Sequence, residues 1–484
     1  MSAANSSSTV LAPMPSPAPR ILLVGFHTPL NQAAVLRALE QEGSASFVAL
    51  ISRSNFLGEK ANVFIDSSTG YRNLGFTVSH GWPFPSRELW ERLRPSEVVA
   101  MQMMDRVHRI SGARNRLESR KRRWLEWVAY AHGFLRHHGI DRVVHCNVPH
   151  FPFEYILHEV ARALGLETHF LMQLPVKKTF LVTDSITGIY KPLMVELKRL
   201  GADSPPALEP RMQAELERRT TRHEPFYMHS RGVPLWTRLH SWQRRLFRIK
   251  LRAIPTALAY WRARRASARR SSADAPYVYF PMHLQPEATT LPLGGVYEDQ
   301  ILVVDSLARA LPKGWQIVVK ENPKQRFDKR DASLYHRLRS LPAVRLVARD
   351  ADSFDLLEGS KAVAAITGTA GWEALCAGKP VLTFGNAFYR HAEGSTPVDG
   401  SGALSRALEQ LAAGDLATPS PEGCARLLAA LQAVSYCGMS DSVYLRDTNA
   451  EDLENAVRTC TAAVAEMLGQ TKASPPRPKG AVSN

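Results

Sequence analysis

Residues 362–384 have the pattern of a strand, a glycine-containing loop, a helix and a second strand, and this unit constrains the fold more than any other part of the chain. The apolar run 362–366 leads into a loop of small residues at 367–371. A helical pattern begins at Trp372, and Gly378 and Pro380 end it before the apolar run 381–384. Two strands joined through a helix pair in parallel, so the unit predicts a parallel sheet.

The loop of this unit is a candidate phosphate site. A helix N-terminus leaves backbone N–H groups without helical partners and places the positive end of the helix dipole behind them, which suits a phosphate. Glu373, in the first turn, is placed to bind a ribose hydroxyl. An ordinary turn with a glycine for close packing is the alternative. The candidate nucleotide-binding residues are Thr367, Gly368, Thr369, Gly371 and Glu373.

The same alternation of strands and helices extends from residue 277 to 384 and also opens the chain at residues 20–51. A chain of 484 residues is long enough for two domains. We therefore predict an α/β fold with two Rossmann-like, doubly wound domains that face each other across a cleft. The expected segments are a disordered tail at 1–19, a first domain at 20–202, a basic helical linker at 203–276, a second domain at 277–415, C-terminal helices at 416–469 and a disordered tail at 470–484.

Polar residues follow successive predicted strands of the second domain. Ligands of open α/β sheets bind beyond the carboxyl ends of the strands. His283, Gln285 and Glu287 follow the strand at 277–282, and Lys320 and Asn322 end the strand at 315–320 and begin its loop. We predict that these residues meet at one edge of the sheet.

Each of these residue types has a role in phosphate chemistry. Lys320 is the best candidate to stabilise charge on a leaving phosphate. His283 is a candidate phosphate ligand or proton donor, and Glu287 a base or hydroxyl ligand. The alternatives are a surface lysine, a structural histidine and a first-turn carboxylate. On the acceptor side, the candidates are His150 and Glu154, at a strand-to-helix junction of the first domain.

The cysteines and acidic pairs predict no metal site. Five cysteines are scattered through the chain without paired spacing, which favours a reducing cytoplasm over a disulfide framework or a zinc site. Asp350, Ala351 and Asp352 resemble a metal-binding Asp-x-Asp motif, but the following helix makes Asp352 a better helix cap. The sequence shows neither a signal peptide nor a run long enough for a membrane span.

The net charge of +16 is concentrated in one segment. Residues 236–272 contain eleven Arg and Lys residues and no acidic one. A basic amphipathic helix with Trp and Leu is typical of proteins that lie on an anionic membrane. A solvated connector is the alternative, and a nucleic-acid surface ranks last because no nucleic-acid-binding motif accompanies the charge.

Three motifs in order resemble the bacterial capsule polysaccharide biosynthesis and export family, which includes the transferases that add 3-deoxy-manno-octulosonic acid (Kdo). They are YFPMHLQPEATTLPLGG at 279–295, VKENP at 319–323 and ITGTAGWEALCAGKPVLTFG at 366–385. The resemblance implies a GT-B glycosyltransferase fold, with the sugar nucleotide in the second domain and the acceptor facing the first. Asn322 departs from the family, which commonly has His-Pro where this chain has Asn322-Pro323.

Carried over by motif, Thr367, Gly368 and Thr369 match the donor-phosphate loop and Glu373 the acidic residue of the following helix. The strand-end motif is matched by His283, Gln285 and Glu287, and the basic residue after the next strand by Lys320.

The leading hypothesis is a metal-independent glycosyltransferase of capsule or surface polysaccharide synthesis, without a bound cofactor. Its co-substrate is a nucleotide sugar, with CMP-Kdo as a candidate, and its acceptor a glycolipid or polysaccharide. We expect it in the cytoplasm and, through its basic segment, at the inner membrane. A sugar-nucleotide 2-epimerase of the same fold and a non-catalytic capsule assembly or export subunit are the alternatives.

Overall fold

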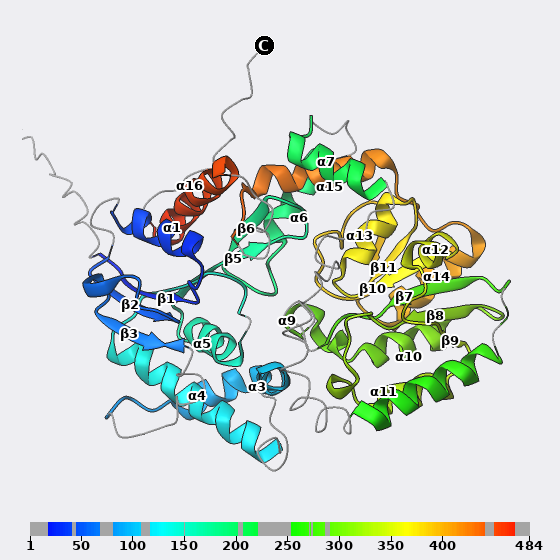
Figure 1. Ribbon diagram of the computed structural model, residues 1–484, viewed down its shortest axis with the longest axis horizontal. Helices are drawn as coiled ribbons and strands as arrows, with labels where there is room; N and C mark the ends of the chain where they lie inside the picture. Colours follow the sequence, from blue (N-terminus) through cyan, green and yellow to red (C-terminus); the bar gives the residue numbers. More distant parts are fainter. Residues whose placement is uncertain are drawn as a thin grey trace, which may run out of the picture.

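A computed structural model describes residues 18–40, 45–67, 81–107, 117–149, 151–201, 207–220, 253–270, 272, 274–285, 291–440 and 450–469. The described chain forms two α/β halves, each built around its own sheet (Figure 1). His150 and Glu287 lie outside the described residues. The predicted tails at 1–19 and 470–484 also lie outside them, apart from positions 18 and 19.

The first half contains a seven-stranded sheet in the order β13-β6-β5-β4-β1-β2-β3. The strands from β3 to β5 are parallel, whereas β6 pairs antiparallel with β5 and β13 antiparallel with β6. The doubly wound core agrees with the prediction, and the antiparallel edge was not predicted. Its elements are β1 (Arg20–Val24), α1 (Pro29–Glu40), β2 (Phe47–Ser52), β3 (Val63–Asp66), α3 (Arg87–Val107), α4 (Leu117–His137), β4 (Arg142–His145), α5 (Pro152–Ala163), β5 (Glu167–Gln173), β6 (Thr179–Thr183) and α6 (Lys191–Leu200).

The second half contains a six-stranded parallel sheet in the order β12-β11-β10-β7-β8-β9. Counted from β7, this is the strand order of a dinucleotide-binding fold, and the order reverses between β7 and β10. Its elements are β7 (Tyr277–Pro281), α9 (Leu291–Gly294), α10 (Gln300–Ala310), β8 (Gln316–Lys320), α11 (Ala332–Ser340), β9 (Val344–Leu346), α12 (Ser353–Glu358), β10 (Ala362–Ala365), α13 (Thr369–Cys376), β11 (Val381–Thr383), β12 (Ser395–Pro397) and α14 (Ser401–Ala413).

The last part of the chain returns to the first half. It comprises α15 (Pro421–Val434), β13 (Tyr436–Cys437) and α16 (Ala450–Met467). Helix α16 lies beside α1, red next to blue in Figure 1, where Cys460 and Val464 share a buried cluster with Ala34 and Val35. The helices expected at 416–469 are present, but they pack as part of the first domain's core and join the two halves.

Both described ends of the predicted linker are packed structure. Helix α7 (Pro210–Thr220) lies against α13 and α15. Residues 253–268 form a second helix, whose Ala259, Tyr260 and Ala263 belong to the core of the second half. None of the helices described has the length and apolar character needed to cross a membrane.

Candidate active site

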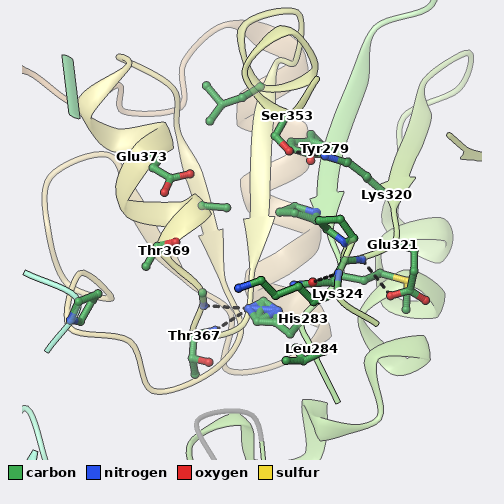
Figure 2. Close-up of a pocket in the computed structure, with 18 of the residues that line it drawn as sticks. Tyr279, His283, Leu284, Lys320, Glu321, Lys324, Ser353, Thr367, Thr369 and Glu373 are labelled. Atoms are coloured by element: carbon green, nitrogen blue, oxygen red, sulfur yellow. Dashed lines mark hydrogen bonds between the residues drawn. The ribbon is translucent and has the colours of Figure 1, made fainter. Parts of the chain in front are cut away.

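A cavity of about 840 Å³ opens at the carboxyl ends of β7, β8 and β10, where the strand order of the second sheet reverses (Figure 2). Its wall includes the loops that follow these strands and the segment 349–354. Met172, Gln173 and Tyr190 of the first half complete it. The cavity therefore lies between the two halves, at the place where open α/β sheets bind ligands.

His283, at the end of β7, holds the loop that follows β10. Its Nε2 atom accepts hydrogen bonds from the backbone N–H groups of Gly368, at 2.8 Å, and Thr367, at 3.3 Å (Figure 2). Because Nε2 is the acceptor, the ring proton lies on Nδ1. Burial and the nearby Arg330 guanidinium lower the pKa of His283 to about 4. The imidazole is therefore neutral near pH 7, which fits the alternative of a structural histidine. The amides of Thr367 and Gly368, which the sequence predicted to bind phosphate, instead donate to this imidazole.

We expect this histidine to make the fold sensitive to acid. A pKa lowered from 6.5 to about 4 means that the unfolded chain binds the proton more readily, so stability is complete above pH 6.5 and falls as the pH drops toward 4. Between pH 6.5 and 4, the free energy of unfolding measured in urea should therefore fall by up to roughly 3 kcal/mol less in His283→Gln than in wild type.

The exposed histidine His336 offers a matched control, since His336→Gln should keep the wild-type pH dependence. His27 and His145 also have lowered pKa values, so they too make the protein less stable in acid. Their contribution is the same in wild type and in both variants, and it cancels when the variants are compared with wild type. Equal pH dependence in wild type and His283→Gln would contradict the prediction.

Thr369 and Ala370 are the first two residues of α13, and both line the cavity. The two glycines of the same loop, Gly368 and Gly371, are needed for close packing. A Cβ atom at Gly368 would lie 2.7 Å from His283 Nε2, so a side chain there would displace the imidazole. Gly371 is not among the lining residues, and a Cβ there would collide with the Tyr389 ring. Its close packing explains this glycine without a ligand.

Glu373 lies on the cavity wall and is held by a residue from the predicted linker. Arg219 of α7 donates to its Oε1 atom at 2.6 Å. Burial raises the pKa of the Glu373 carboxyl, and Arg219 and the Thr369 hydroxyl oppose that shift. Glu215 binds Arg219 at 2.8 Å and the Trp372 indole at 3.1 Å, which fixes α7 on α13. Sequence reasoning missed Arg219, because 154 residues separate it from Glu373.

Lys320 is a buried cation on the opposite wall. It ends β8, its residue is 7% exposed, and its Nζ atom lies 2.5 Å from Ser353 Oγ. Figure 2 shows its side chain reaching from β8 toward Ser353. Lys324, from the loop after β8, is a second cation on the lining and was not among the predicted site residues.

Gln285 belongs to a polar network that reaches the cavity wall at His283 and Glu321, but Gln285 itself is not among the lining residues. Arg330 donates to Gln285 Oε1 at 2.5 Å and to the carbonyl oxygen of His283 at 2.8 Å. The same guanidinium pairs with Glu321, which is fully buried, at 3.1 Å. Gln300 adds hydrogen bonds to Gln285 and to both backbone groups of His283. Gln285 therefore helps to fix the loop that carries His283.

Asn322 lies on the lining, in a turn that arginine stabilises. Its Oδ1 atom accepts the backbone N–H of Lys324 at 2.9 Å. Arg349 donates to the carbonyl oxygens of Pro323 and Gln325, each at 2.6 Å. Asn322 presents a neutral amide, so the positive charge on this wall comes from lysine and arginine.

Glu154, predicted on the acceptor side, is not a lining residue of the cavity. It lies in the first turn of α5, where its Oε2 atom accepts the backbone N–H of Phe151 at 3.3 Å. This is the geometry of a helix cap. His150 and Glu287 are outside the described residues, so their roles stay predictions. Gln173 and Tyr190, which the sequence analysis did not select, are the first half's polar residues on the lining.

The prediction that Asp352 caps a helix is confirmed. Its Oδ1 atom accepts the backbone N–H groups of Phe354 and Asp355, at 2.7 and 3.0 Å, and α12 begins at Ser353. Among the described residues, no cluster of three or more His, Cys, Asp or Glu side chains has the arrangement to hold a metal ion. None of the five cysteines, each within the described ranges, forms a disulfide.

Residues 207–399 match the family model described as capsule polysaccharide biosynthesis protein. None of the curated proteins matches the chain. Among solved structures, the chain is similar to Thermosulfurimonas dismutans KpsC, beta Kdo 2,7 transferase, with 13% identity and a TM-score of 0.32 over 76% of this chain and 95% of that chain. It is also similar to UDP-GlcNAc 2-epimerase from Methanocaldococcus jannaschii, with 10% identity and a TM-score of 0.27 over 83% of this chain and 95% of that chain. At these scores the structural likeness is distant, and no site residue is assigned from it.

Proposed function

We propose that this chain, whose residues 207–399 match the capsule polysaccharide biosynthesis family model, is a glycosyltransferase of that family that uses a nucleotide sugar. One observation carries the proposal: the cavity at the switch point joins a buried cation, a helix N-terminus and a carboxylate. Cations and helix amides bind phosphate, and a carboxylate accepts hydrogen bonds from ribose hydroxyls.

In this proposal the donor lies against the second half. Lys320 and the first amides of α13, from Thr369 and Ala370, face the donor phosphate. Glu373, held by Arg219, accepts a ribose hydroxyl. When the bond between the sugar and the phosphate oxygen breaks, the negative charge that develops on that oxygen is stabilised by Lys320 and the helix dipole. The acceptor hydroxyl approaches from the side of Gln173 and Tyr190. Its oxygen forms the new bond to the sugar while its proton passes to a base, the role predicted for Glu287.

The finer assignments are part of the same proposal. We propose CMP-Kdo as the first donor to test, a glycolipid or polysaccharide as acceptor, no catalytic metal, and action at the cytoplasmic face of the inner membrane. Asn322, on the same lining, can supply the donor only a neutral hydrogen bond.

Calorimetry with CMP, UDP and GDP tests the proposal directly. A glycosyltransferase should bind one of the three, and the Lys320→Met variant should bind it more weakly. Incubation of the protein with the matching nucleotide sugar alone then separates two enzymes: an epimerase changes the donor without any acceptor, whereas a transferase needs one. Binding of none of the nucleotides would favour a non-catalytic subunit and overturn the proposal.

A further inference from the structure

The helix at 253–268 carries large apolar side chains on its solvent side. Ile254 and Leu258 are each 48% exposed and Trp261 is 50% exposed. Their spacing of four and three residues places them on one face of the helix. Three such side chains in a row are unusual for a surface that faces only water, because each leaves apolar area in contact with solvent.

The opposite face fixes this helix to the second half. Thr256, Ala259, Tyr260, Ala263 and Ser267 are all buried. The Tyr260 hydroxyl donates to the carbonyl oxygen of Val347 at 3.3 Å, and its ring packs against Phe327. The helix therefore already has its core-facing side, and the Ile254–Leu258–Trp261 stripe is a second, outward apolar side.

Arginines surround the outward stripe. Arg262, Arg265 and Arg269 are exposed, and helical spacing puts them on the same side as Leu258. Arg264 lies over the Trp261 ring, 5.3 Å from its centre. In sequence, the 37-residue segment 236–272 has no acidic residue to neutralise this charge.

We infer that this outward face of residues 254–269 docks on an anionic membrane surface. Leu, Ile and Trp side chains enter the boundary between headgroups and acyl chains, while the arginines bind lipid phosphates. Nucleic acid would also attract the arginines, but single-strand binding relies on aromatic stacking platforms and gains little from exposed Ile and Leu. The mixed apolar and cationic face thus fits a membrane better than a polynucleotide.

The position of this face links the membrane to the cavity. Phe327, which packs against Tyr260 of the helix, also carries the Arg349 guanidinium 5.0 Å from its ring centre. Arg349 lines the cavity. A membrane bound to the outer side of the helix would therefore lie behind the part of the cavity wall that the second half contributes. The docking surface itself does not rest on the proposed function.

Vesicle co-sedimentation of the full-length protein tests the charged part of this face. The probe is a vesicle of equal parts phosphatidylcholine and phosphatidylglycerol, with pure phosphatidylcholine as the uncharged comparison. Each arginine near an anionic surface contributes about a fivefold gain in affinity, so the triple variant Arg262→Gln/Arg265→Gln/Arg269→Gln should bind on the order of 100-fold more weakly. The matched control Arg87→Gln/Arg94→Gln/Arg122→Gln removes the same charge from exposed positions of α3 and α4 and should bind as wild type.

The apolar part is tested separately. Leu258→Gln/Trp261→Gln should weaken vesicle binding at least about tenfold, while Val98→Gln/Leu117→Gln, at similarly exposed positions of the first half, should have no effect. Circular dichroism and nucleotide calorimetry should be unchanged in all four variants, since none of the altered residues lines the cavity. Wild-type binding by both face variants, equal losses in the controls, or tighter binding to single-stranded DNA than to vesicles would overturn the inference. These outcomes are independent of whether the protein transfers sugar.

Discussion

Replacing Arg330 by methionine is expected to lower the free energy of unfolding by about 3–5 kcal/mol, measured by urea denaturation. The guanidinium pairs with Glu321, which is fully buried and also accepts a hydrogen bond from Tyr335 at 2.5 Å. Without Arg330, the Glu321 carboxylate keeps its burial but loses its counter-charge. The same change removes the donors to Gln285 and to the His283 backbone, so the loop after β7 should loosen.

An exposed ion pair in the same half provides the control. Arg337 binds Asp305 at 2.9 Å near the surface, and Arg337→Met should cost less than about 1 kcal/mol. The double variant Arg330→Met/Glu321→Met should recover part of the loss, because it removes both buried charges. If Arg330→Met unfolded within about 1 kcal/mol of wild type, the buried pair would not be a main support of the site.

Much of the second half could be predicted because its signals are local. The helix expected directly after Asp352 is α12 (Ser353–Glu358), and Asp352, the cap that starts it, lies next to it in the sequence. The helix expected from Trp372 begins three residues earlier, at Thr369, because the small loop residues also adopt helical geometry. Gly378, which has a φ of +73°, ends that helix as expected, since glycine tolerates this conformation best.

The contacts that define the site could not be read in this way, because their partners are far apart in the sequence. His283 meets Gly368 across 85 residues, and Arg219 meets Glu373 across 154. Local patterns likewise gave no sign that α16 packs on α1 or that β13 extends the first sheet. The pattern of residues located the loops at the strand ends, and only the fold shows which side chains support those loops and which line the cavity.

Lys320→Met is expected to lower turnover by roughly 100-fold or more, in an assay with the nucleotide sugar identified by calorimetry. Lys320 is the last residue of β8, and it is buried in the cavity wall. Methionine keeps most of the side-chain volume, so the free energy of unfolding should change by less than about 1.5 kcal/mol. A loss in turnover with little loss in stability is the signature of a charge that acts on the reaction.

The control for Lys320 is Lys361→Met, which removes the same charge from an exposed position at the other end of the sheet, just before β10. It should leave turnover unchanged, because its ammonium lies away from the residues that line the cavity. Lys320→Arg restores the charge but carries a bulkier, planar group beside Ser353, so it should recover only part of the activity. Wild-type turnover in Lys320→Met would show that the leaving phosphate meets another cation, and Lys324, on the same lining, would then be the residue to replace.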